Sequence, residues 1–124
     1  MANLSSMPII REQTNMMNFQ ALSPYTGDNP EFSKQLVLAL LSELDLFLQT
    51  VKERMNEDDF LNFRRANHSI SPSLQMLEMR ELIDAIDAYK SAYINSPASI
   101  AEKAVRIKEL VQLSVLEAKS WINS

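Results

Sequence analysis

The sequence predicts an all-α fold, an antiparallel up-and-down four-helix bundle with a short additional N-terminal helix. Three observations lead to this prediction. The 124 residues include one glycine, Gly27, and no segment alternates apolar and polar residues over the length of a strand. From Phe32 onward, apolar residues recur at spacings of three and four, which is typical of amphipathic helices. Four long helices joined by short connections pack most simply as antiparallel neighbours.

Length and composition indicate a single domain. A chain of this size buries one modest core, so we expect a flexible segment over residues 1–14 and one bundle over residues 15–124. The net charge of -4 disfavours nucleic acids and anionic membranes as partners. The longest apolar run, residues 36–41, is far shorter than the roughly 20 residues that span a membrane. We therefore expect a cytoplasmic monomer.

The scarcity of two residue types excludes several classes of site. Phosphate-binding loops, dinucleotide fingerprints and nucleophile elbows all need glycines, because their backbones approach a ligand closely or adopt a positive φ. The chain also contains no cysteine, which excludes disulfides and thiolate metal sites. The sequence therefore excludes the classes of enzyme that depend on such glycines.

Capping signals place the first two helices. A short helical segment over residues 18–22 is expected to end at the sequence SPYTGDNP. Asn29 is expected to cap a long helix whose first residue is Pro30, where a missing N–H costs nothing. That helix is expected to run to about Met55. Its apolar seam steps alternately by four and three residues: Val37, Leu41, Leu44, Leu48, Val51 and Met55.

Three further helices follow. The sequence NEDD marks a turn, in which Asp58 or Asp59 suits the positive N-terminal end of the third helix. The third helix carries its stripe at the same spacing: Phe60, Phe63, Asn67, Ile70, Leu74 and Leu77. The fourth is expected from about Glu78 to about Ile94, with one face made of Met79, Leu82, Ile86, Tyr89 and Tyr93. The last is expected to run to about Ile122 from a capping box of Ser99 and Glu102, with Ser96 as the competing cap.

These stripes predict a core to which all four long helices contribute. The residues expected in it are Leu41, Leu44, Phe47, Leu48, Phe63, Ile70, Leu82, Ile86, Ile107 and Val111.

His68 is the only histidine, and the pattern predicts that its imidazole faces solvent at the edge of the third helix's stripe. It lies one residue, or about 100°, around the helix from Asn67. Residues three, four and seven positions away share its face: Leu61, Arg64, Arg65, Ser71, Pro72 and Gln75. Two cations, a hydroxyl and an amide therefore surround one nucleophilic ring.

The residues alone leave the role of this face open. A lone histidine beside two arginines is most often part of a solvated helix face. A catalytic triad is disfavoured, because nothing places a serine nucleophile and an orienting carboxylate beside His68. No metal site is expected, because a single imidazole without cysteines or the HExxH spacing is an incomplete ligand set.

The segment over residues 58–86, DDFLNFRRANHSISPSLQMLEMRELIDAI, resembles the active-site helix pair of histidine-containing phosphotransfer (HPt) domains. Their usual pattern is an acidic turn followed by LRRAAHxLKGSAxxLGxxxLxxxxxxLE. The register holds without a gap, because RRA precedes His68 with the family's spacing and Ile70 and Ser73 occupy the family's apolar and serine positions. The order and lengths of the flanking helices match from about Phe19 to Ile122.

The resemblance implies that His68 is the phosphoryl acceptor of a two-component phosphorelay. Its neutral imidazole Nε2 would attack a phospho-aspartate of a response-regulator receiver domain, or of a hybrid sensor kinase, and pass the group to another aspartate. The chain itself would bind no cofactor, because the receiver brings the carboxylate and Mg²⁺. Phosphoryl transfer requires mainly correct positioning and charge neutralisation. A histidine on a rigid helix with a nearby cation can meet these requirements.

Three residues differ from the family pattern. Ser71 replaces a lysine, Pro72 replaces a glycine and is expected to kink the helix, and Glu78 replaces a second glycine at the turn between the two helices. We expect Arg64 to supply the missing cation, because a guanidinium binds phosphate through paired hydrogen bonds. The alternative function is a degenerate HPt-like bundle that binds receivers or other proteins without carrying phosphate; an unrelated helical adaptor is the third interpretation.

Overall fold

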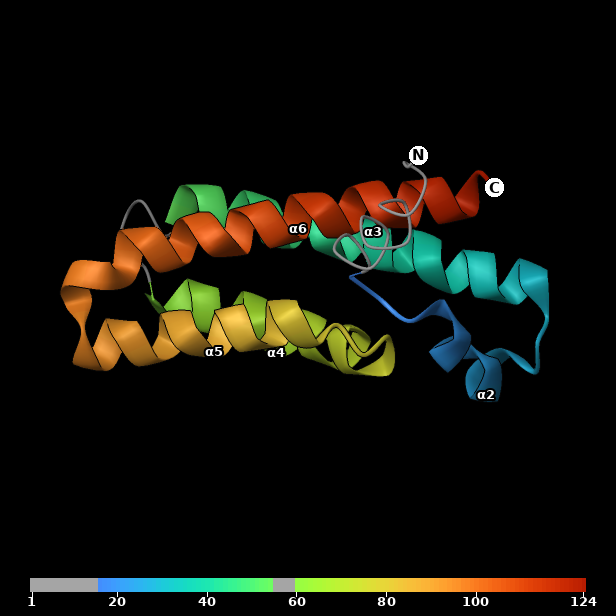
Figure 1. Cartoon of the computed structure of the whole chain (residues 1–124), viewed down its shortest axis with the longest axis horizontal. Helices are drawn as coiled ribbons and strands as arrows, with labels where there is room; N and C mark the ends of the chain where they lie inside the picture. The colour runs from blue at the N-terminus through green and yellow to red at the C-terminus, as the bar shows by residue number, and fades with distance from the viewer. Residues whose placement is uncertain (1–15, 55–59) are drawn as a thin grey trace, which may run out of the picture.

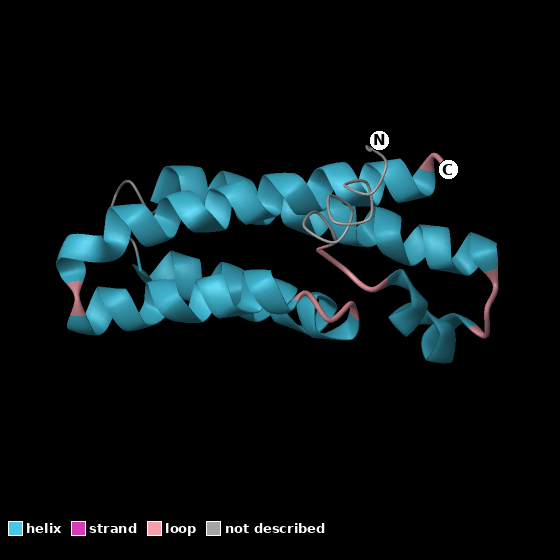
Figure 2. Ribbon diagram, in the orientation of Figure 1, coloured by secondary structure: helices cyan, strands magenta, loops and turns pink. Residues whose placement is uncertain are grey.

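The protein is all-α in the residues that the structure, a computed structural model, describes: 16–54 and 60–124. The elements in chain order are the 3₁₀ turn η2 (Phe19–Leu22), α2 (Ser23–Thr26), α3 (Pro30–Arg54), α4 (Phe60–Met76), α5 (Arg80–Asn95), the 3₁₀ turn η3 (Pro97–Ser99) and α6 (Ile100–Ile122). No strand occurs within these two ranges (Figure 2). The predictions for residues 1–14, for Met55 and for the turn with Asp58 and Asp59 concern positions outside them.

The four long helices are arranged so that each packs against two others. Helix α3 contacts α4 and α6, and α5 contacts the same two helices. Figure 1 shows α6 beside α3 in one layer and α5 beside α4 in a second. One end of the α3 and α6 layer extends beyond α4 and α5, and η2 and α2 lie at that end (Figure 1).

The core is one apolar cluster to which all four long helices contribute. Eight of the ten residues expected in it are buried: Leu44, Phe47, Phe63, Ile70, Leu82, Ile86, Ile107 and Val111. The prediction was wrong for Leu41 and Leu48, which are half-buried and pack against the edge of the cluster. The seam of α3 instead steps by three and four, through Val37, Leu40, Leu44, Phe47 and Val51.

The start of α3 confirms the predicted cap. The Asn29 side chain accepts a hydrogen bond of 3.1 Å from the Phe32 N–H, and Pro30 is the first helical residue. The expected end of the preceding segment was wrong, because the chain stays helical through Thr26. Pro24 stands in the first turn of α2, where no N–H is needed, and Gly27 ends the turn with a φ of 60°.

A left-handed residue separates α4 from α5, and α5 begins at Arg80, two residues after the start that the sequence predicts at about Glu78. Glu78 has a φ of 54°. Its N–H donates to the Gln75 carbonyl at 3.1 Å, and the Met79 N–H donates to the Leu74 carbonyl at 2.9 Å. These two bonds form the Schellman motif that commonly ends helices at a glycine. The position at which the resembled family has a glycine therefore adopts a positive φ here with a glutamate.

The start of α6 differs from the predicted capping box. Neither Ser99 nor Ser96 makes a side-chain capping hydrogen bond. The Ser99 hydroxyl donates instead to the Ser96 carbonyl at 2.9 Å, within the 3₁₀ turn η3 that precedes the helix. The local turn thus uses the hydroxyl that a capping box would have required.

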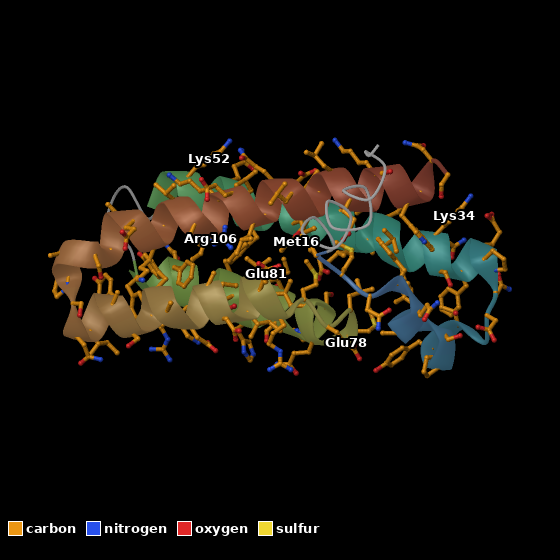
Figure 3. All side chains as sticks on the ribbon, in the orientation of Figure 1. Met16, Lys34, Lys52, Glu78, Glu81 and Arg106 are labelled. Atoms are coloured by element: carbon orange, nitrogen blue, oxygen red, sulfur yellow. The ribbon has the colours of Figure 1, made fainter. Side chains whose placement is uncertain are left out.

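An ion pair joins the exposed sides of α5 and α6. Arg106 Nη2 lies 3.4 Å from Glu81 Oε2, and both side chains are about half exposed (Figure 3). Exposed pairs of this kind contribute little, about 0–1 kcal/mol. The apolar cluster therefore determines how these helices pack.

Candidate functional site

Helix α4 positions His68 toward solvent, as predicted. Phe63, Ile70 and Leu74 form the buried side of the helix and are at most 2% exposed. His68 lies on the opposite, exposed side, near the middle of the 17 residues of the helix. The backbone at His68 is therefore part of a helix whose opposite side packs in the core.

Six predicted neighbours share α4 with His68, and we call these seven residues the His68 face: Leu61, Arg64, Arg65, His68, Ser71, Pro72 and Gln75. Six of them are exposed and Ser71 is half-buried. Arg64 and Arg65 precede His68 by four and three residues, so both side chains emerge one helical turn before it. Among the described residues, no hydrogen bond or ion pair engages the side chain of His68 or of either arginine, which leaves two guanidinium groups available to an anion on this face.

Ser71 and Gln75 are joined directly. Gln75 Nε2 donates a hydrogen bond of 3.3 Å to Ser71 Oγ. Because this bond uses a lone pair of the Ser71 oxygen, the hydroxyl hydrogen can still be donated to a group bound near His68. The pair supplies a neutral donor at the position where a lysine was expected from the resemblance.

Pro72 lies inside α4, and the helix continues past it to Met76. Proline has no backbone N–H, so the His68 carbonyl lacks its usual helical donor four residues later. Both residues are exposed, which allows water to satisfy the carbonyl. The ring of Pro72 also adds a rigid apolar surface one helical turn after His68 on the outer side of α4.

Contacts on the other side of α4 were not predicted from the sequence. Ser73 Oγ donates to Glu43 Oε1 at 2.6 Å, which fastens the His68 helix to α3. Close to this bond, Ser69 and the exposed Leu46 line a small surface pocket of about 290 Å³ between α3 and α4. Helical spacing alone does not pair Glu43 with Ser73, because the pairing depends on how α3 and α4 are offset along their axes.

The N-terminal residues form a second unpredicted feature, which we call the strap (residues 16–22). The Glu117 carboxylate accepts hydrogen bonds from the Met16 N–H at 3.0 Å and the Met17 N–H at 2.8 Å. Burial raises the pKa of the Glu117 carboxyl, and the bonds from Met17 and Met16 partly offset this rise by favouring the charged form. The strap is therefore fixed to α6 through a partly desolvated carboxylate.

The strap also reaches the end of the His68 helix. The Asn18 N–H donates to the Leu77 carbonyl at 2.8 Å, and Asn18 Nδ2 donates to Glu78 Oε1 at 3.0 Å. Glu78 lies at the end of α4, where Figure 3 shows it. One short segment thus connects α6 with the turn that follows α4.

The described residues provide neither a metal site nor a membrane-spanning helix. No group of three or more histidine, cysteine, aspartate or glutamate side chains there is arranged to hold a metal ion. Nor does any helix in the described ranges combine the length and apolar character needed to cross a membrane.

The comparisons with known proteins add no relative. No family model, curated protein or solved structure matches the chain.

Proposed function

We propose that the chain is a histidine phosphotransfer protein of a two-component phosphorelay, folded as an antiparallel up-and-down four-helix bundle with a short additional N-terminal helix. His68 accepts a phosphoryl group from a receiver-domain aspartate and passes it to another. The observation that carries the proposal is an exposed imidazole in the middle of a core-anchored helix, with an exposed arginine one turn earlier. The chain is a stoichiometric carrier and acts as a cytoplasmic monomer.

The transfer requires little of this chain beyond position and charge. The lone pair of the neutral imidazole Nε2 forms the N–P bond as the P–O bond to the aspartate breaks, the carboxylate leaves, and the imidazole Nδ1 proton goes to water. The partner, a response-regulator receiver or a hybrid sensor kinase, brings Mg²⁺ and the aspartate. Arg64 binds the phosphoryl oxygens in place of the family lysine, since the added group carries about -1.5 to -2 charges.

A second function is favoured by Ser71 and Pro72, which stand where the resembled family has a lysine and a glycine. With one cation fewer and an added ring beside His68, the face can bind receivers without accepting phosphate. In this second function the chain still binds a receiver domain but accepts no phosphoryl group. A phosphotransfer experiment therefore distinguishes the two functions.

The deciding experiment incubates the full chain with a panel of phosphorylated receiver domains. We expect label on the native protein and none on His68→Gln, which keeps a polar side chain on an exposed helix position. The bond should be acid-labile and alkali-stable, as a phosphoramidate is and a phosphoserine at Ser69, Ser71 or Ser73 is not. Binding without transfer supports the second function, and absence of binding to every receiver contradicts both.

Arg64→Ala tests the role of the cation. We expect slower formation or a shorter lifetime of the phosphohistidine, because the charge near the phosphoryl oxygens falls by one. Arg80→Ala is the matched control, since Arg80 is exposed on α5 and lies outside the His68 face. Ser71→Lys, which restores the family's cation, should act in the opposite direction to Arg64→Ala. Unchanged kinetics for Arg64→Ala would assign the role to Arg65 or to the partner.

A further inference from the structure

A surface groove lies beside the strap, at the C-terminal end of α6. Its lining includes Phe19, Leu113, Leu116, Glu117 and Trp121, and its volume is about 500 Å³. Leu116 is 65% exposed and Leu113 is 36% exposed, so two leucines one turn apart present apolar surface to solvent. The rings of Phe19 and Trp121 stack at 4.6 Å with an interplanar angle of 2°, which gives the groove a flat aromatic wall. We call this feature the Trp121 groove.

The chain enters the described structure at the edge of this groove. Glu117 lines the groove, and its carboxylate accepts hydrogen bonds from the backbone nitrogens of Met16 and Met17. Both methionines are only 3% exposed. The peptide nitrogen that links Met16 to residue 15 is therefore bound to a groove-lining side chain, and the preceding residues start from that point.

The sequence before Met16 contains one apolar run, Met7, Pro8, Ile9 and Ile10. An extended chain spans at most about 3.3–3.6 Å per residue, so Ile10 lies within about 20 Å of Met16. From Leu113 to Trp121, helix α6 advances by only about 12 Å at 1.5 Å per residue. The whole length of the groove is within reach of the run.

We propose that the Trp121 groove is an intramolecular docking site for residues 7–10. In this proposal, the side chains of Ile9 and Ile10 cover the apolar lining of the groove. Their contact with it removes the exposed apolar surface of both the groove and the run from water. Exposed apolar surface of this kind commonly marks a site that another segment covers. A segment of the same chain that begins at the groove has a high effective concentration there, which favours it over a partner in solution.

Trp121 is the only tryptophan of the chain, so its fluorescence reports on the groove without a label. The test compares the native protein with the double variant Ile9→Ser and Ile10→Ser at low concentration. We expect the variant to emit at longer wavelength and to be quenched more strongly by acrylamide, because water reaches the indole. Leu4→Ser is the matched control, since it removes an apolar side chain outside the run and should leave both signals unchanged.

A second experiment adds the apolar run as a separate peptide. A synthetic peptide of residues 5–12, added to the double variant, should shift the emission back toward the native value, and a scrambled peptide should not. On the groove side, Leu116→Ser should weaken this effect, whereas Val105→Ser, at an exposed position of α6 outside the lining, should not. Far-UV circular dichroism verifies that every variant keeps its helices.

The outcomes separate this proposal from its alternatives. Identical Trp121 signals in the native chain and the double variant overturn it. A native signal that changes with protein concentration also overturns it, because the groove would then be covered by a second copy. Neither result depends on phosphotransfer at His68.

Discussion

Two glutamates hold the strap against the helices: Glu78, which follows α4, and Glu117 on α6. Glu78 accepts a hydrogen bond from the Asn18 side chain while its own backbone adopts a φ of 54°. Glu117 accepts the N–H groups of Met16 and Met17. A non-glycine residue in the left-handed region costs of order 1 kcal/mol or more, and the Schellman bonds and the Asn18 contact offset that cost.

Glu117 also makes stability depend on pH. Its pKa is raised in the folded state, so between the ordinary value of 4.5 and the raised value the folded protein holds a proton that the unfolded chain has lost. This contribution to stability is present below about pH 4.5 and is lost as the pH rises through the folded pKa. We expect Glu117→Gln, which is neutral throughout and keeps one acceptor oxygen for the strap, to lack this decline.

Urea unfolding at a series of pH values, from about 4 to about 8, measures the effect. The stability of Glu117→Gln relative to the native protein should rise with pH across the window. Glu109→Gln, at an exposed glutamate of the same helix, is the control for the loss of one negative charge. A parallel pH dependence for the native protein and Glu117→Gln would contradict the burial argument.

At the scale of elements, the seam of α3 shows what periodicity leaves undecided. The helix has leucines at both 40 and 41, and apolar residues at both 47 and 48. Steps of four and three through Leu41 and Leu48 fit the sequence as well as steps of three and four through Leu40 and Phe47. Packing against α4 and α6 selects the second set, and a single helix carries no information about its neighbours.

Neighbouring leucines provide a direct comparison. Leu40 is 1% exposed, whereas Leu41 is half-buried at the edge of the core. Leu40→Ala should lower the free energy of unfolding by about 2–5 kcal/mol, and Leu41→Ala should lower it by clearly less, because its side chain leaves a smaller cavity. Urea denaturation of the two variants measures both values. A larger loss of unfolding free energy for Leu41→Ala than for Leu40→Ala would contradict the observed seam and favour the one that the sequence predicts.

At the scale of the whole molecule, the sequence predicts the long helices and the exposure of His68 well. Both follow from spacing within one helix, which also assigns Arg64, Ser71 and Gln75 to the His68 face. The contacts it misses join separate elements: Ser73 with Glu43, and Glu117 with the strap. Such contacts depend on the relative offsets of elements far apart in the chain, which no local pattern encodes.

The same apolar cluster extends between the two ends of the molecule and should make its unfolding cooperative. Phe60 and Tyr93 stack at 4.1 Å near one end, and Trp121 stacks on Phe19 near the other. Leu44, on α3 between them, is 0% exposed. Since one continuous core connects both ends, Trp121 emission and far-UV circular dichroism should report the same urea midpoint in the native protein.

Leu44→Ala tests this cooperativity. It should lower the free energy of unfolding by about 2–5 kcal/mol and move both midpoints together, because the cavity destabilises the single core that the two signals share. Leu46→Ala, at a 66% exposed leucine of the same helix, is the matched control and should move neither midpoint appreciably. If Leu44→Ala shifts the circular dichroism transition and leaves the Trp121 transition in place, the strap and the end of α6 unfold as a separate unit. A near-neutral effect of Leu44→Ala on both would contradict the core itself.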